Sequence, residues 1–266
     1  MATAFINGFD LAFEDIGSGR PLVLLHGFPF NRTMWSSQVD FLKDRYRVIT
    51  PDFRGLGQSG PGPGGSAGMD EMARDVIALL DHLRLDRAVI GGLSMGGYVT
   101  LALYKLFPLR VRAMILADTK AQADTEEGRA TRFLQATKIS EEGMGSVADE
   151  LLQKLVAPAS FERRQDVVTF TRNMILNTDP AGAVAALHGM AARRDYTYFL
   201  SQIYPPAWIV VGSEDQIAPV SDAEVMHREI RGSRLTVIEG AGHVSNLEYP
   251  QEFNEALLDF LETLEP

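Results

Sequence analysis

The chain has 266 residues, 45% of them hydrophobic and 23% charged, and carries a formal net charge of −10 at pH 7. These values predict an ordinary globular protein of one elaborated α/β domain, and the negative charge argues against a nucleic acid or an anionic membrane as partner. The absence of cysteine excludes disulfides, thiolate zinc sites and cysteine nucleophiles, and without a visible signal peptide or membrane span we expect a cytoplasmic protein.

The first part of the chain alternates between predicted strands and predicted helices. Apolar runs bounded by turn residues predict strands over residues 4–6, 11–15, 21–25, 47–50, 88–90 and 111–117. Amphipathic segments predict helices over residues 35–43, 70–83 and 98–107, with Asp70 as the cap of the second. The Gly- and Pro-rich segment 60–68 is expected to be a mobile surface loop.

The alternation stops at residue 119 and returns near residue 206. Between these points only helices are expected, over residues 126–137, 144–156, 161–176 and 180–192 and near Tyr198. Strands follow at 207–211 and 234–238, with helices at 220–230 and 250–264. We therefore predict an α/β fold, a mostly parallel doubly wound sheet with an all-helical cap inserted after the sixth strand. Residues 1–118 and 206–266 would form the core domain and residues 119–205 the cap.

The most informative motif lies between the strand at 88–90 and the helix at 98–107. It is Gly92-x-Ser94-x-Gly96, the nucleophile-elbow pattern in the strand–turn–helix context that the pattern requires. The glycines fit the crowding of a strand that reverses into a helix within a few residues. The turn would hold Ser94 at its tip, near the positive end of the helix dipole.

Two further motifs follow the last two predicted strands. Asp215 lies just after the strand at 207–211, and His243 lies just after the strand at 234–238. Loops at the carboxyl ends of parallel strands share one edge of the sheet, where ligands bind. Nucleophile, acid and base in this chain order are typical of the α/β-hydrolase arrangement. We therefore predict Ser94, Asp215 and His243 as a catalytic triad.

With these motifs the whole chain resembles the α/β-hydrolase superfamily, and within it the small esterases and enol-lactone hydrolases with a helical cap. The matching segments are His26-Gly27-Phe28-Pro29, the segment 52–59, the elbow, the segment 212–219, Gly240-Ala241-Gly242-His243, and 116–119 with 123–125. The resemblance implies a serine hydrolase in which Ser94 forms an acyl-enzyme and no metal or cofactor takes part. The oxyanion would be held by the backbone N–H groups of Phe28 and Met95.

Other polar residues are assigned structural roles. His26 is expected to orient the oxyanion loop rather than act as the base, and Arg54 to belong to a loop network. Asp118 follows the sixth strand, where some relatives of this superfamily place the acid, but we favour Asp215. His82, His188 and His227 lie in predicted helices without ligand neighbours at metal spacing.

The sequence says less about the substrate than about the triad. We expect a small-molecule ester or lactone, and a homodimer is compatible with the sequence. Ten apolar cap side chains favour a small hydrophobic acyl group: Phe133, Leu134, Met144, Phe161, Phe170, Met174, Leu187, Tyr196, Tyr198 and Phe199.

Several other activities remain open on the same triad. They are carbon–carbon bond hydrolysis, cofactor-free haloperoxidase or perhydrolase chemistry and, less favoured, hydroxynitrile lysis. A ligand receptor of this fold is the non-enzyme alternative. Serine at position 94 excludes the dehalogenase and epoxide-hydrolase branch, which needs aspartate there.

Overall fold

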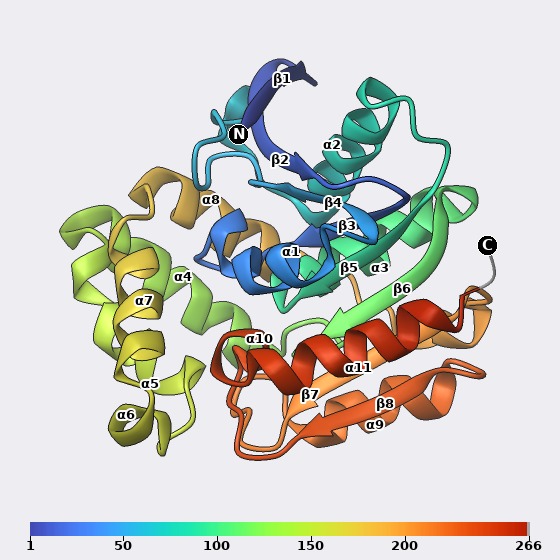
Figure 1. Ribbon diagram of the computed structural model, residues 1–266. Coiled ribbons are helices and arrows are strands. Elements are labelled where there is room, and N and C mark those ends of the chain that lie inside the picture. The colour runs from blue at the N-terminus through green and yellow to red at the C-terminus, as the bar shows by residue number, and fades with distance from the viewer. Residues whose placement is uncertain (265–266) are drawn as a thin grey trace.

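A computed structural model, which describes residues 1–264, shows one eight-stranded sheet with helices on both faces (Figure 1). The strands are β1 (Ala2–Ile6), β2 (Phe9–Ile16), β3 (Arg20–Leu25), β4 (Tyr46–Pro51), β5 (Ala88–Leu93), β6 (Val111–Ala117), β7 (Ala207–Gly212) and β8 (Arg234–Ile238). Their order is β1-β2-β4-β3-β5-β6-β7-β8. β2 pairs antiparallel with β1 and β4, and all other neighbours are parallel. The predicted mostly parallel, doubly wound sheet is confirmed.

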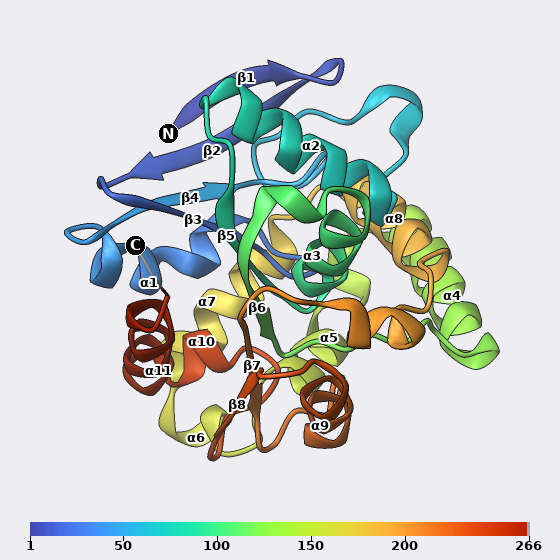
Figure 2. The ribbon, with the colours of Figure 1, turned by 90° about the vertical axis from the view of Figure 1, so that its right-hand side faces the viewer.

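The core helices form a layer on each face of this sheet (Figure 2). α1 (Ser36–Leu42) and α11 (Pro250–Glu262) cover one face, and α2 (Met69–His82), α3 (Met95–Leu106) and α9 (Val220–Glu229) cover the other. Every residue of β5 and of β7 is buried. A strand that is covered on both faces needs apolar side chains on both, which explains why these segments are continuous apolar runs.

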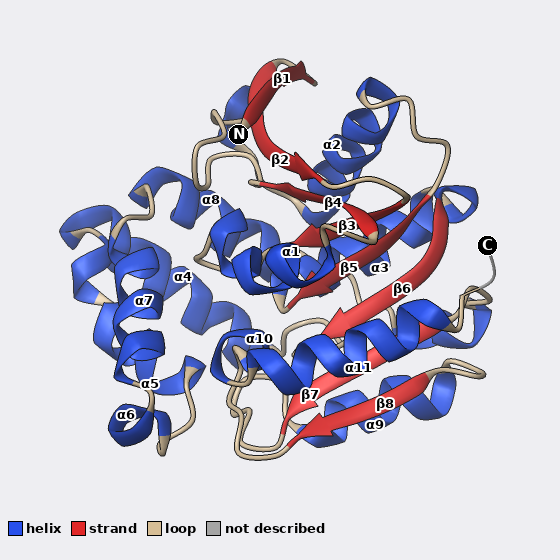
Figure 3. Cartoon of the chain, in the orientation of Figure 1, coloured by secondary structure: helices blue, strands red, loops and turns tan. Residues whose placement is uncertain are grey.

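The segment between β6 and β7 contains five α-helices, and we call this segment the cap. They are α4 (Glu126–Glu142), α5 (Ala148–Leu155), α6 (Ser160–Arg163), α7 (Gln165–Leu176) and α8 (Pro180–Ala191). They lie beyond the ends of the sheet toward which the β5 and β6 arrows point (Figure 3). None of the helices formed by residues 1–264 has the length and apolarity that crossing a membrane requires.

Several helix bounds differ from the sequence expectation. α3 begins at Met95, directly after Ser94 and within the elbow motif, and not at residue 98. The expected helix 144–156 is a 3-10 turn (Met144–Ser146) followed by α5, and the expected helix 161–176 is interrupted at Arg164 between α6 and α7. The cap segments are short, and their ends depend on packing within the cap, which periodicity does not encode.

Asp70 is not the cap of α2, contrary to the prediction. The helix begins at Met69, with Gly68 in the capping position. The carboxylate that closes this end is that of Glu71, whose Oε2 accepts the Gly68 N–H at 2.9 Å. Asp70 lies in the first turn, where a negative charge favours the helix dipole.

The glycine-rich segment after β4 is covered in part by the cap helix α8. An ideal Cβ on Gly182 would lie 1.7 Å from the Gly55 carbonyl oxygen, and one on Gly189 would lie 2.0 Å from the Ala67 carbonyl oxygen. The two helix glycines are seven residues apart and therefore share one face of α8. This face lies directly on the backbone at Gly55 and at Ala67, so the end of the segment 60–68, expected to be a surface loop, also supports the cap.

We expect Gly182→Ala to lower the free energy of unfolding by about 1–3 kcal/mol, because the added methyl must displace backbone rather than a flexible side chain. Thermal unfolding measures the effect. Gly145→Ala is the matched control, since an ideal Cβ on Gly145 meets nothing within 4 Å. Equal melting temperatures for the two variants would contradict the packing described here.

Candidate active site

Ser94 lies at the tip of the turn between β5 and α3, in a backbone conformation that few side-chain-bearing residues adopt. Its φ is +53° and its ψ −113°. Around it, an ideal Cβ on Gly92 would lie 2.1 Å from the Gly96 carbonyl carbon, and one on Gly96 would lie 2.3 Å from the Leu25 carbonyl oxygen. Only glycine fits at these two positions, which explains the motif. Strain at a serine enclosed in this way is typical of functional sites.

A chain of hydrogen bonds joins Ser94 to His243 and Asp215. His243 Nε2 lies 2.7 Å from Ser94 Oγ, and His243 Nδ1 lies 2.9 and 2.8 Å from the two carboxylate oxygens of Asp215. The exposed fractions of the three residues are 8%, 1% and 5% in the order Ser94, His243 and Asp215. The structure therefore brings together the three residues that the sequence predicted, from three loops at one edge of the sheet.

The partners of each group decide where the protons lie. Asp215 Oδ1 also accepts the N–H groups of Ile217 and Ala218, at 2.8 and 2.9 Å. A carboxylate in this position accepts from His243 Nδ1–H, which leaves the Nε2 lone pair to accept the Ser94 hydroxyl proton. The arrangement can deprotonate Ser94 as it attacks an electrophile.

The two predicted oxyanion donors lie on the segments that border Ser94. Met95 is the first residue of α3, so its N–H has no acceptor within the helix. Phe28 follows Gly27, and an ideal Cβ on Gly27 would lie 3.5 Å from Ser94 Cβ. That Phe28 and Met95 donate to the oxyanion stays a prediction.

His26 connects the backbone of Gly27 to the backbone of Phe53, which lies in the segment after β4. Its Nδ1–H donates to the Gly27 carbonyl at 2.9 Å, and its Nε2 accepts the Phe53 N–H at 3.0 Å. Both ring nitrogens are thereby used in the neutral form, as expected for a structural histidine. Burial lowers the pKa of His26 below its ordinary value, because a charged imidazole is poorly solvated there.

This lowered pKa predicts a pH-dependent contribution to stability. The contribution of His26 is present above pH 6.5 and is lost as the pH falls through the lower pKa of the folded state. We expect the difference in melting temperature between wild type and His26→Gln to shrink between pH 7.5 and pH 5, by roughly 2–4 °C for each kcal/mol lost. Taking the difference between the two proteins removes the effect of other titrating groups. A difference that is constant with pH would contradict this role.

Asp118, the alternative acid, is next to the site but does not occupy the position of the acid. Its Oδ1 accepts the Gly212 N–H at 2.9 Å and its Oδ2 accepts the Ser245 hydroxyl at 2.6 Å. Burial, and then the nearby charge of Asp215, raise its pKa well above the ordinary value. The hydrogen bonds to the histidine come from Asp215, so the geometry favours Asp215 as the acid.

One further polar residue, which the sequence did not single out, contacts residues 242–244 around His243, which we call the histidine segment. Glu248 belongs to the short helix α10 (Ser245–Glu248) and is completely buried. A single acidic residue between Leu247 and Tyr249 was the available signal, but its partners lie about 90 residues away in the cap. Arg54, by contrast, has the expected structural role, since it donates to both carboxylate oxygens of Asp75 at 2.7 and 2.8 Å.

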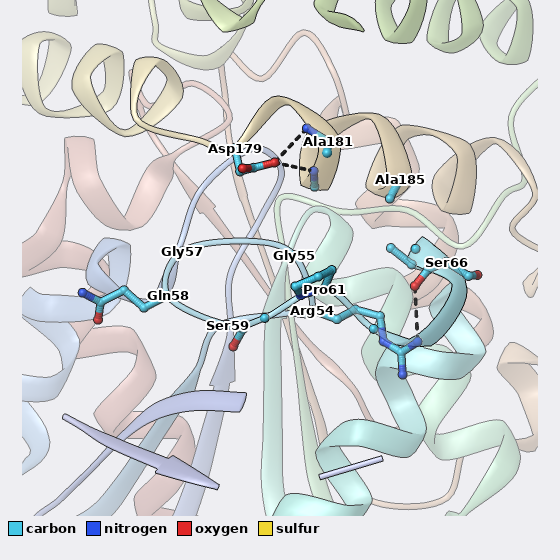
Figure 4. Close-up of a pocket in the computed structure, with 15 residues that line it drawn as sticks. Arg54, Gly55, Gly57, Gln58, Ser59, Pro61, Ser66, Asp179, Ala181 and Ala185 are labelled. Atoms are coloured by element: carbon cyan, nitrogen blue, oxygen red, sulfur yellow. Dashed lines mark hydrogen bonds between the residues drawn. The ribbon is translucent and has the colours of Figure 1, made fainter. Parts of the chain in front are cut away.

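The cavity shown in Figure 4 is separate from this arrangement. It has a volume of about 500 Å³ and lies between the segment after β4 and the start of α8, and none of its lining residues belongs to the triad. Asp179 accepts the N–H groups of Ala181 and Gly182 at its upper rim. In the part of the chain that the structure describes, no three His, Asp or Glu side chains gather in a way that could hold a metal ion.

The residues expected to form an acyl pocket in the cap differ in how far they are exposed. Leu134 and Tyr198 expose 72% and 61% of their surface, too much for residues that line a protected cavity. Met174 is buried, and its sulfur lies 3.8 Å from the Thr33 hydroxyl, on the segment that follows Phe28. Met174 therefore packs against the core segment that follows Phe28.

Comparison with known proteins finds similarity over most of the chain. A family model described as "alpha/beta hydrolase fold" matches residues 20–250. A 3-oxoadipate enol-lactonase of Acinetobacter baylyi is 31% identical over 236 residues, which cover 89% of this chain and 86% of the relative.

Two solved structures are similar along their full length. A thermophilic esterase from Thermogutta terrifontis is 38% identical, with a TM-score of 0.97 and complete coverage of both chains. An enol-lactonase from Burkholderia xenovorans is 29% identical, with a TM-score of 0.91 and coverage of 98% of this chain and 100% of the other.

Proposed function

Because the chain belongs to the α/β-hydrolase family, we propose that it is a serine hydrolase that cleaves small carboxylic esters or lactones. The observation that supports this most directly is the contact between His243 Nε2 and Ser94 Oγ at 2.7 Å, with Asp215 on the other ring nitrogen. A serine hydroxyl is a weak nucleophile at neutral pH and needs such a base.

The first half of the proposed reaction forms an acyl-enzyme. Ser94 Oγ attacks the carbonyl carbon while His243 takes the hydroxyl proton, and Asp215 stabilises the imidazolium that results. The tetrahedral oxyanion accepts hydrogen bonds from the N–H groups of Phe28 and Met95, and loss of one such donor typically costs about 10²–10³ in rate. His243 then gives its proton to the leaving alkoxide, and the alcohol departs.

The second half repeats these steps with water. His243 takes a proton from water as the water attacks the acyl carbon, and returns it to Ser94 Oγ as the acid is released. In a lactone the leaving alcohol is part of the same molecule, so the product is a single hydroxy acid. Every proton moves between protein groups, substrate and water, so the proposed reaction uses no cofactor.

One observation supports esters and lactones as the substrates, and another bears on the size of the acyl group. The similar proteins reported above are an esterase and enol-lactonases, and the two bond types need the same acyl-transfer machinery. Only 8% of the Ser94 surface is exposed beneath the cap, which favours a small acyl group.

The proposal is tested with p-nitrophenyl esters of increasing acyl length, from acetate upward, followed by simple lactones. We expect turnover that falls steeply with chain length, since a larger acyl group must displace cap side chains. The absence of turnover on all esters and lactones by folded protein would overturn the proposal.

A further inference from the structure

Glu248 accepts hydrogen bonds from two parts of the chain that meet beside the catalytic histidine. Its Oε1 accepts the N–H of Gly242, the residue before His243, at 2.6 Å. Its Oε2 accepts the N–H of Ala157 at 2.9 Å and the hydroxyl of Ser160 at 2.5 Å. One carboxylate oxygen therefore binds the histidine segment, and the other binds the cap at Ala157, which follows α5, and at Ser160, the first residue of α6.

A second bond joins the same two segments on the other side of His243. The N–H of Val244 donates to the Leu155 carbonyl oxygen at 3.2 Å. The contact is close, because an ideal Cβ on Gly242 would lie 2.5 Å from the Ala157 nitrogen. Both neighbours of His243 are thus connected to the cap, one directly and one through Glu248. In Figure 3, α10 lies on the side of the core that faces the cap helices.

We propose that Glu248 is a positioning residue that makes the placement of His243 depend on the cap. The inference rests on the proposed function, in which His243 takes the Ser94 proton. When residues 155–160 lie in place, the carboxylate holds the Gly242 N–H and fixes the backbone that carries the imidazole. When they move away, Glu248 loses two of its three donors, so the carboxylate that holds Gly242 is less well fixed, and Val244 loses its hydrogen bond to Leu155.

The chemistry of the three donors explains why a carboxylate is needed. The two N–H groups can only donate, and an ionised carboxylate accepts on both oxygens. A glutamine has one accepting oxygen, so its NH₂ group would face an N–H on one of the two sides. Burial raises the pKa of Glu248, against the effect of its hydrogen bonds. Arg164, whose guanidinium lies over the Tyr249 ring 3.9 Å from its centroid, acts in favour of the charge.

The test is the rate at which an alkyl fluorophosphonate labels Ser94. In this reaction the Ser94 oxygen bonds to phosphorus, the phosphorus–fluorine bond breaks, fluoride leaves and His243 takes the hydroxyl proton. We expect Glu248→Gln to slow labelling by about 10²-fold, the cost of misplacing a catalytic group by about 1 Å. The downfield N–H proton resonance of the His243–Asp215 hydrogen bond should weaken or broaden in the same variant.

Two further variants complete the design. Glu252→Gln removes the same charge from an exposed position on α11 and should label at the wild-type rate. Ser160→Ala removes one donor on the cap side alone and should give an intermediate rate, which keeps the test available if Glu248→Gln does not fold. All rates are measured well below the melting temperature of each variant, so that loss of stability alone does not change them.

The outcomes separate this inference from the function on which it rests. Wild type that is not labelled at Ser94 would overturn the proposed function. Wild type that is labelled, with Glu248→Gln folded and labelled at the same rate, would overturn the role of Glu248 alone. If Ser160→Ala folds and Glu248→Gln does not, a wild-type labelling rate in Ser160→Ala would likewise overturn the role of Glu248.

Discussion

Ser94→Ala should lower kcat on p-nitrophenyl acetate by about 10⁶-fold, the loss typical of removing the nucleophile from a serine–histidine unit. The physical reason is that the hydroxyl 2.7 Å from His243 Nε2 is that of Ser94, so the variant lacks the nucleophile that this base activates. The protein should remain folded, because the lost hydroxyl is small and alanine keeps the Cβ.

The measurement compares wild type, Ser94→Ala and Ser140→Ala under the same conditions. Ser140 is exposed on α4 of the cap, and its replacement should leave kcat unchanged. The fluorophosphonate should label wild type and Ser140→Ala at one serine and leave Ser94→Ala unlabelled. Undiminished turnover in Ser94→Ala would show that another group performs the chemistry.

Asp215→Asn should lower kcat on the order of 10⁴-fold, the second of the two large effects. The asparagine NH₂ would face His243 Nδ1, which must then act as an acceptor, and the proton would move to Nε2. The Nε2 lone pair that receives the Ser94 proton would be lost. The N–H groups of Ile217 and Ala218 donate to Asp215 Oδ1. They would hold the asparagine oxygen in that place, which leaves the NH₂ group facing His243 Nδ1.

Asp118→Asn is the matched comparison, since both aspartates are buried within hydrogen-bond range of the same loops. The raised pKa of Asp118 means that its carboxyl is more easily protonated, and an amide resembles a protonated carboxyl. An asparagine there still accepts from Gly212 and can donate to the Ser245 oxygen. We expect a loss of no more than about tenfold, comparable to one ordinary hydrogen bond. A larger loss for Asp118→Asn than for Asp215→Asn would assign the acid to Asp118.

The residues of the triad could be predicted because each one lies on the loop that follows a strand of the sheet, β5, β7 or β8. A short apolar run, its end and the residue that follows are local features, and the parallel sheet brings such ends together. The elbow adds its own evidence, because Gly92 and Gly96 are required by contacts within a few residues of Ser94 or with the neighbouring strand. Fold class and triad therefore follow from information that the sequence carries locally.

The rest depends on contacts between distant segments. Glu248 resembles any acidic residue near the start of a helix until the cap segment with Ala157 and Ser160 is placed against it. The wrong expectation for the cap on α2 has a local cause instead: the helix begins at Met69, so Gly68 takes the capping position and Glu71, three residues on, accepts its N–H. The two halves of the expected helix 161–176 separate at Arg164, whose φ of −138° no periodicity predicts.

The packing of α8 on the backbone of Gly55 and Ala67 has a consequence for engineering. Gly182 rests on Gly55, and two residues earlier the Phe53 N–H binds His26, which in turn binds the carbonyl of Gly27. A cap grafted from a relative would place a different helix surface on residues 53–67, and any shift there would reach the peptide beside Ser94. Chimeras should therefore exchange the segment after β4 together with the cap, as one inherited module.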